Sequence, residues 1–273
     1  MTMLPRLLIT VLVILITSAF SSKLPSAFVE LSCIDRTILR EIRYTTPHNF
    51  IGHPIPGVVD PVCLLTLPAA HALSAAQRLL VPQGYSLKVY DCYRPQRAVD
   101  AFVSWAANLS DTLMRDEFYP RVDKAQLFAD TYMTPTSGHS RGSTVDITIV
   151  ALPVVPTREF IPGEKLLHCT APKEQRFPDN SVDMGTGFDC FDRLSWPDDE
   201  RIVGLQRVNR DLLRRTLESV GFVATETEWW HFTYQPEIFP GTFFNFDVTW
   251  EAVEKVCAEG GGRRDDVFRA NEL

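Results

Sequence analysis

The sequence lacks the features that mark several large protein classes. Its formal net charge of −7 leaves no basic footprint for nucleic acid. No two cysteines have the close C-x-x-C spacing of a thiolate zinc site. The chain has no internal repeats, and no linker divides it into two domains. Beyond the N-terminus, no apolar run reaches the ~20 residues that a membrane span requires. These absences indicate one globular domain with no nucleic-acid partner and no stable membrane span.

The N-terminus has the pattern of a secretory signal. One positive charge within residues 1–6 is followed by an apolar run over 7–16 and by small residues up to Ser22. The run is too short for a membrane anchor, so we expect a signal peptide over residues 1–22, cut near Ser21 or Ser22. The mature chain is then secreted or periplasmic. We expect its domain to cover 23–248, and residues 249–273 to form a short helix and a partly disordered extension.

An oxidising compartment would allow the six cysteines to form disulfides. Six cysteines permit 15 pairings, and the sequence does not choose among them. Cys169 and Cys190 flank a proline-containing irregular stretch, which makes them the first pair to expect. For Cys33, Cys63 and Cys92, buried free thiols and disulfides are equally open.

Hydrophobic spacing predicts a mixture of helices and strands. Helical spacing is found over four segments: 68–81, 96–115, 125–132 and 204–220. In the second of these we expect Leu109 on one face with Ala98, Phe102 and Trp105. Strand patterns cover 86–93, 144–150 and 223–234. Residues 152–183 contain prolines and read as an irregular surface insertion. The fold class is therefore α+β.

Two short stretches carry residue types that bind metals. His139 and Asp146 stand seven residues apart around Gly142, and Glu228 stands three residues before His231. Two imidazoles and a carboxylate suit zinc and leave a fourth position for water, as in catalytic sites. Glu228 would then be the general base. Positions three apart in a strand face opposite sides, so a bulge or a strand end must re-aim Glu228 or His231.

A competing pattern overlaps the first stretch. Residues 138–142 match G-x-S-x-G, the nucleophile elbow of serine hydrolases, with Ser140 as nucleophile. That elbow needs a helix directly after the serine. The residues that follow, 143–149, are mostly β-branched and favour a strand. Ser140 is therefore not expected to be a nucleophile.

The sequence resembles the D-alanyl-D-alanine dipeptidase family, the zinc peptidases of vancomycin resistance. The similarity runs from about Arg43 to Val248 and rests on several motifs in order. They are Arg43-Tyr44 with Asn49-Phe50 and Gly52, residues 90–98 (YDCYRPQRA), residues 137–146, residues 184–189 (MGTGFD), residues 228–231 (EWWH) and residues 234–246. The resemblance implies one α+β domain with a central, mainly antiparallel sheet and flanking helices, as in hedgehog and D,D-peptidase zinc folds.

The resemblance also implies roles for individual residues. It implies one zinc ion per chain, bound by His139, Asp146 and His231. Glu228 would act as general base, and Arg94 would stabilise the oxyanion at the scissile carbonyl. The substrate would be contacted by Ser137, Asp189 and Tyr44, with the aspartate suiting a free ammonium group. The other histidines match no ligand position and are expected at the surface or in loops: His48, His53, His71 and His168.

The expected activity is hydrolysis of D-alanyl-D-alanine or a related D-amino-acid dipeptide. Two departures from the family pattern bear on the substrate: Val58 stands where a tyrosine is expected, and the 152–183 segment is long enough to reshape the cleft. One alternative is a D,D- or L,D-carboxypeptidase acting on peptidoglycan stem peptides. A second is a zinc-holding domain that only binds partners, as in hedgehog proteins, although such a role needs neither Glu228 nor Arg94.

Overall fold

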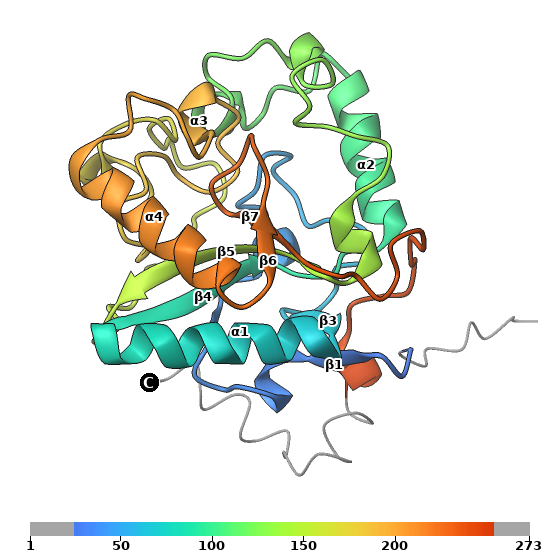
Figure 1. The fold of residues 1–273 in the computed structure, drawn as a ribbon. Helices are drawn as coiled ribbons and strands as arrows, with labels where there is room; N and C mark the ends of the chain where they lie inside the picture. The colour runs from blue at the N-terminus through green and yellow to red at the C-terminus, as the bar shows by residue number, and fades with distance from the viewer. Residues whose placement is uncertain (1–24, 254–273) are drawn as a thin grey trace, which may run out of the picture.

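The computed structural model describes residues 25–253 (Figure 1). The signal peptide expected over 1–22 lies outside these residues, as does most of the expected C-terminal extension. The described start of that extension is helical over 250–253, as predicted. Among residues 25–253, no helix is both long enough and apolar enough to cross a membrane.

Two sheets form the centre of the fold. The larger has the strand order β2-β4-β5-β7-β6, and the smaller is the pair β1-β3. Their strands are β1 (Phe28–Glu30), β2 (Leu39–Arg40), β3 (Leu64–Thr66), β4 (Tyr85–Asp91), β5 (Thr144–Ala151), β6 (Phe222–Ala224) and β7 (His231–Tyr234). All neighbours are antiparallel except β2 and β4. The expected α+β domain with a mainly antiparallel sheet is therefore observed.

The helices lie on both sides of the larger sheet. They are α1 (Leu67–Leu80), α2 (Gln96–Ala107), α3 (Arg115–Phe118) and α4 (Gly204–Glu218). Short 3-10 turns complete the chain: η1 (Leu31–Cys33), η2 (Arg43–Thr45), η3 (Val81–Gln83), η4 (Lys124–Gln126), η5 (Gly138–Arg141), η6 (Lys173–Gln175) and η7 (Arg193–Ser195). In Figure 1, α1 runs below the sheet and contacts β4 and α4, whereas α2 stands above it. Strand β5 gives Val145, Ile147 and Ile149 to the core, so Asp146 faces the other side.

Two predicted helices are shorter than their sequence patterns. The 96–115 segment stops at Ala107, because Asn108 leaves the helical conformation while its N–H still bonds the carbonyls of Ser104 and Trp105. Leu109 therefore lies beyond the helix and is 56% exposed, not on its buried face. The predicted 125–132 helix is only the single turn η4.

The predicted strand over 223–234 is also wrong as one element. It is a hairpin in which β6 and β7 pair antiparallel, with Glu228 in the connection and His231 at the start of β7. His231 N–H donates to the Glu228 carbonyl at 3.3 Å, which closes a turn. Glu228 thus lies beyond the end of the strand, which changes the direction of its side chain. A strand end is one of the two arrangements, with a bulge, that the three-residue spacing allows.

Disulfides tie loops to this framework. Cys169 pairs with Cys190, as expected, and Cys63 pairs with Cys92. Within residues 25–253 no cysteine is a free thiol, which resolves the choice left open for Cys63 and Cys92.

A buried ionic network joins the sheet to the insertion. Asp179 accepts bonds from Lys88 at 2.6 Å, Arg43 at 2.9 Å and Tyr90 at 2.5 Å. Burial would raise the pKa of the Asp179 carboxyl, but Lys88 and Arg43 outweigh burial and hold that pKa well below its ordinary value. Because the folded-state pKa is depressed, this stabilisation is present above the unfolded pKa of about 4 and is lost as the pH falls below it.

We expect Asp179→Asn to destabilise the fold by about 3 kcal/mol at pH 7, because the two buried cations Arg43 and Lys88 would keep only Glu41 as an anionic partner. The difference from wild type should shrink at acid pH, and urea unfolding at both pH values measures it. The control is Asp198→Asn, which removes an exposed partner of Arg214 and should change stability by less than ~0.5 kcal/mol. An unchanged midpoint for Asp179→Asn would contradict the prediction.

Candidate metal centre and cavity

Three elements bring His139, Asp146 and His231 together. Strands β5 and β7 pair so that Asp146 lies directly opposite His231. His139 comes from η5, which ends at Gly142 in the left-handed region with φ 83°. A Cβ atom there would also come within 2.3 Å of the Phe28 ring, so glycine is required for the chain to turn from η5 into β5.

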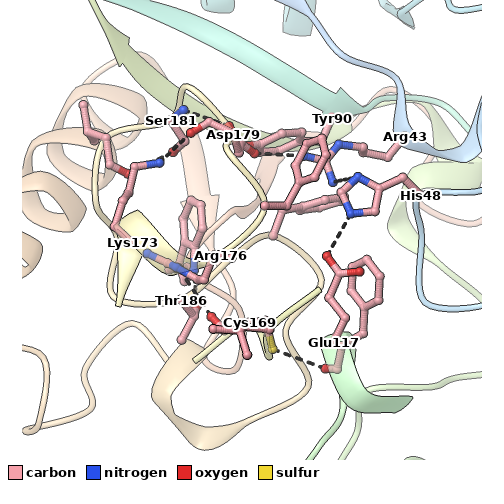
Figure 2. A pocket seen from close by; sticks show the side chains of 17 residues that line it. Arg43, His48, Tyr90, Glu117, Cys169, Lys173, Arg176, Asp179, Ser181 and Thr186 are labelled. Carbon is pink, nitrogen blue, oxygen red and sulfur yellow. Dashed lines mark hydrogen bonds and ion pairs between the residues drawn. The ribbon is translucent and has the colours of Figure 1, made fainter. Parts of the chain in front are cut away.

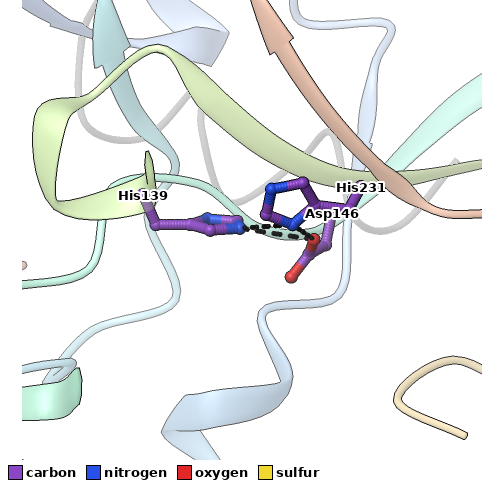
Figure 3. Close-up of side chains that lie close together, drawn as sticks. All are labelled: His139, Asp146 and His231. Carbon is purple, nitrogen blue, oxygen red and sulfur yellow. Dashed lines mark hydrogen bonds and ion pairs between the residues drawn. The ribbon is translucent and has the colours of Figure 1, made fainter. Parts of the chain in front are cut away.

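The three side chains point their polar atoms at one another (Figure 3). His139 Nε2 lies 3.3 Å from both His231 Nδ1 and Asp146 Oδ1, and the last two atoms lie 3.1 Å apart. Ligand atoms about 2.0–2.1 Å from a tetrahedral zinc ion are separated by about 3.3–3.4 Å. The spacing of these two nitrogens and one oxygen therefore fits a zinc-sized cation.

The hydrogen bonds of His139 prepare it as a ligand. Its Nδ1 lies 2.6 Å from the Cys92 carbonyl oxygen, which can only accept, so Nδ1 carries the proton and Nε2 has a free lone pair. Burial, together with the nearby Arg94 cation, lowers the pKa of His139 and keeps the ring neutral. Asp91 Oδ2 lies 3.1 Å from the same Nδ1. Asp91 had no role assigned from the sequence, although its place at the end of a strand within the 90–98 motif could have indicated one.

Glu228 lies beside the candidate metal ligands. Its Oε2 is 3.5 Å from His231 Nδ1, and its side chain is 18% exposed. Burial raises the pKa of Glu228 to about 7, with Asp146 adding to the rise and His231 and Arg94 opposing it. A carboxyl with a pKa near neutrality can both accept and return a proton.

Arg94 provides a fixed cation at the same place. It bonds Asp91 and donates to Ser137 Oγ at 3.1 Å, and its guanidinium lies over the Tyr44 and Phe102 rings. Burial disfavours the charge, but Asp91 and Asp146 raise the pKa of Arg94 above its ordinary value. Its Nε is buried and has no hydrogen-bond partner among the residues described. The group therefore keeps one donor available as well as its charge.

Asp189 forms the acidic end of the site. The Tyr44 hydroxyl donates to its two oxygens at 3.1 and 3.3 Å. Burial, with Asp146 and Glu228, raises the pKa of Asp189 well above its ordinary value. A ligand that carries a positive charge would favour the ionised form of this carboxyl.

One cavity of about 230 Å³ connects these groups. Seven of the eight residues proposed from the sequence line it: Tyr44, Arg94, Ser137, Asp146, Asp189, Glu228 and His231. The eighth, His139, is fully buried and is not among the residues that line the cavity. Sequence reasoning missed the apolar walls, which come from distant segments: Phe50, Phe102, Tyr132, Met133, Phe191 and Trp230.

A second, smaller pocket lies next to the 152–183 segment (Figure 2). The segment contributes Cys169, Lys173, Arg176 and Asp179 to it, whereas no residue of the segment is among those that line the 230 Å³ cavity. His48 also lines this pocket. It lies in a loop, as expected, but is only 3% exposed and so is not at the surface. Arg43 and Glu117 bond its two ring nitrogens, which explains why it can be buried.

A His–Asp–His cluster with a carboxyl and a buried cation beside it is the arrangement of a metal-dependent hydrolase. The D-ala-D-ala dipeptidase family model (Peptidase_M15) matches residues 26–154 and 177–249. The chain belongs to this family of metallopeptidases.

Named relatives agree with this assignment. The D-alanyl-D-alanine dipeptidase of Enterococcus faecalis is 35% identical, over 77% of this chain and 92% of the relative. The dipeptidase of Streptomyces coelicolor is 32% identical, over 76% and 91%, and that of Escherichia coli is 26% identical, over 75% and 82%. Among solved structures, the vancomycin resistance D,D-pentapeptidase VanY in complex with Zn(II) matches at 14% identity and a TM-score of 0.35, over 73% of this chain and 87% of the other. A TM-score this low adds nothing to the assignment.

Proposed function

We propose that the protein is a zinc dipeptidase that hydrolyses D-alanyl-D-alanine or a related D-amino-acid dipeptide. The observation that carries the proposal is that one cavity holds both the metal-ligand cluster and the buried acid Asp189. A substrate that places its scissile carbonyl at the cluster and its ammonium group at Asp189 has a free amino terminus close to the bond that is cut. The relatives named above support D-alanyl-D-alanine as that substrate.

His139, Asp146 and His231 would hold the zinc ion, one per chain. Zinc at this site would lower the pKa of a coordinated water and polarise the scissile carbonyl. Glu228 accepts the proton of the attacking water and returns it to the leaving amine. Arg94, whose position is set by Asp91 and Ser137, stabilises the negative charge that develops on the carbonyl oxygen.

At the other end of the substrate, Asp189 pairs with the ammonium group. The pKa of Asp189 is raised in the free protein, and the incoming cation restores its charge. Tyr44 donates to Asp189 and so fixes the direction of the carboxylate. Ser137 lines the cavity next to Arg94 and completes the polar contacts with the substrate.

We also propose that the enzyme works outside the cytoplasm, as a secreted or periplasmic protein. The pattern of residues 1–22 supports this location, and so do the disulfides Cys63–Cys92 and Cys169–Cys190, since disulfides persist in oxidising compartments. N-terminal sequencing of protein from the culture medium or periplasm tests it. A chain that starts at Met1 and is found only in the cytoplasm would contradict it.

The deciding experiment compares D-alanyl-D-alanine with a pentapeptide that ends in D-Ala-D-Ala, with and without a chelator. We expect release of D-alanine from the dipeptide, loss of activity with the chelator and recovery with added zinc. Faster release from the pentapeptide would instead favour the carboxypeptidase alternative. Zinc binding without hydrolysis of either peptide would favour a domain that only binds partners.

We expect Asp189→Asn to raise KM for the dipeptide about thirty- to hundredfold. The amide keeps the shape of the side chain but removes the charge that pairs with the ammonium group, at a cost of about 2–3 kcal/mol. Steady-state kinetics measures this, and kcat should change much less than KM. Glu226→Gln, at an exposed position, is the matched control. A fall in kcat at constant KM would place Asp189 in the chemical step instead.

A further inference from the structure

The backbone of Asp189 has an unusual conformation. Its φ is 57°, in the left-handed region that side chains other than glycine rarely adopt. The residue is also 4% exposed. Such a conformation persists only where the surrounding structure enforces it, and residues of this kind are concentrated at functional sites. The contacts that hold the Asp189 loop therefore bear directly on its function.

A disulfide holds this loop at the residue after Asp189. Cys190 is bonded to Cys169. The Cys169 carbonyl also accepts a hydrogen bond from the Gly187 N–H at 2.9 Å. Cys169 therefore contacts the chain both before and after Asp189. The Cys169 N–H in turn donates to the Glu117 carbonyl at 2.8 Å, which links the loop to helix α3. Figure 2 shows Cys169 and Glu117 side by side at the edge of the smaller pocket.

Cys169 lies in a part of the chain that the family model does not match. The match stops at residue 154 and resumes at residue 177. This inserted segment, 155–176, is itself anchored to the domain. The Phe160 ring stacks on His48 with centroids 4.4 Å apart, and Arg176 bonds Asp183 at 2.8 Å. The insertion is therefore able to serve as a fixed support for the loop.

We propose that the Cys169–Cys190 disulfide is a positioning element for Asp189, through which the 155–176 insertion sets the affinity for the substrate ammonium group. The inference rests on the proposed function, since it gives the inserted segment a task in binding the same dipeptide. Neither cysteine is among the residues that line the cavity with Asp146, His231 and Glu228. Loss of the disulfide is therefore expected to weaken substrate binding while leaving the metal and the chemical step in place.

The first test is the variant C169A/C190A, which removes the disulfide without creating a free thiol. We expect KM for D-alanyl-D-alanine to rise about tenfold, equivalent to ~1.4 kcal/mol, with kcat within about twofold of wild type and zinc content unchanged. Hydrogen–deuterium exchange of residues 186–191 should become faster. A parallel fall in kcat and zinc content, or an unchanged KM, would overturn the proposal.

The matched control removes a second disulfide, Cys63–Cys92, as C63A/C92A. The two cross-links join residues separated by 29 and 21 positions, so the general cost to stability is similar. Alanine at position 92 keeps the backbone carbonyl that accepts from His139 but loses the cross-link that holds this backbone in place, so the variant should lower zinc retention and spare KM. An equal rise of KM in both variants would mean that the effect is only a general loss of stability.

A double-mutant cycle tests whether the disulfide acts through Asp189. When C169A/C190A is combined with Asp189→Asn, KM should rise little beyond that of Asp189→Asn alone, because the positioned carboxylate is already gone. Fully additive effects would reject the coupling. If C169A/C190A does not fold, Gly187→Pro keeps the disulfide and removes the N–H that donates to the Cys169 carbonyl. Proline also fixes φ at residue 187 and restricts Thr186, and this variant should raise KM by a smaller factor.

The proposal and the proposed function fail in different ways. A wild-type protein that hydrolyses no D-amino-acid dipeptide would refute the function. Faster hydrogen–deuterium exchange of residues 186–191 in C169A/C190A would even then support the inference that the disulfide holds the Asp189 loop. Unchanged exchange would overturn that inference.

Discussion

Glu228→Gln should lower kcat by about 10²- to 10⁴-fold while the protein still binds zinc, because the amide cannot accept a proton from the attacking water. Glutamine preserves the volume of the side chain, and the position next to His231 lies in a turn closed by backbone atoms. KM should change little, since Glu228 is expected to act on the reaction more than on binding. Steady-state kinetics and metal analysis of the same preparation measure both effects.

Two comparisons make the Glu228 result specific. Glu226→Gln changes an exposed carboxylate two residues earlier in the same connection and should keep wild-type activity. Glu228→Asp keeps the charge but withdraws it by one methylene, so partial activity is expected. Full activity of Glu228→Gln with zinc bound would remove this residue from the mechanism.

Asp146→Asn should reduce both zinc content and kcat/KM, the latter by about 10³-fold, because zinc supplies several kcal/mol of charge stabilisation. The amide has no negative charge, and Asp146 Oδ1 is the atom that faces both His139 and His231. Isothermal titration of the metal-free protein with zinc gives a readout that does not depend on activity.

His168→Ala is the control for the metal prediction, since it removes an exposed histidine that belongs to no cluster among the described residues. Its zinc affinity should equal that of wild type. If Asp146→Asn retained tight zinc binding, the assignment of the ligand set would be wrong.

The wrong predictions share a physical cause. In each case the local apolar pattern continues past the residue at which the backbone leaves the element. The helical spacing of 96–115 continues through the sequence, but Asn108 terminates the helix at Ala107. The apolar pattern of 223–234 continues through Glu228, but the chain folds back on itself between β6 and β7. Side-chain spacing does not register a turn that is closed by backbone hydrogen bonds.

His48 shows the same limit for burial. The imidazole ring of His48 has two polar nitrogens, and the neighbouring sequence predicts a loop, so burial was not expected. Only the fold brings Arg43 and Glu117 to its two nitrogens, which makes its burial possible. The cavity walls are a similar case, because Phe50, Phe102 and Phe191 come from three segments that no local pattern connects.

The sequence by itself determined the candidate metal ligands and the candidate base, because these roles require particular residue types, and their motifs stand in a recognisable order. It also determined the α+β class, since hydrophobic periodicity is local. Only the tertiary structure decided how His139, Asp146 and His231 meet within 3.1–3.3 Å, since strand register and the Gly142 turn set that spacing. Only the tertiary structure placed the 155–176 insertion behind Asp189, because a disulfide and long-range backbone bonds hold it there.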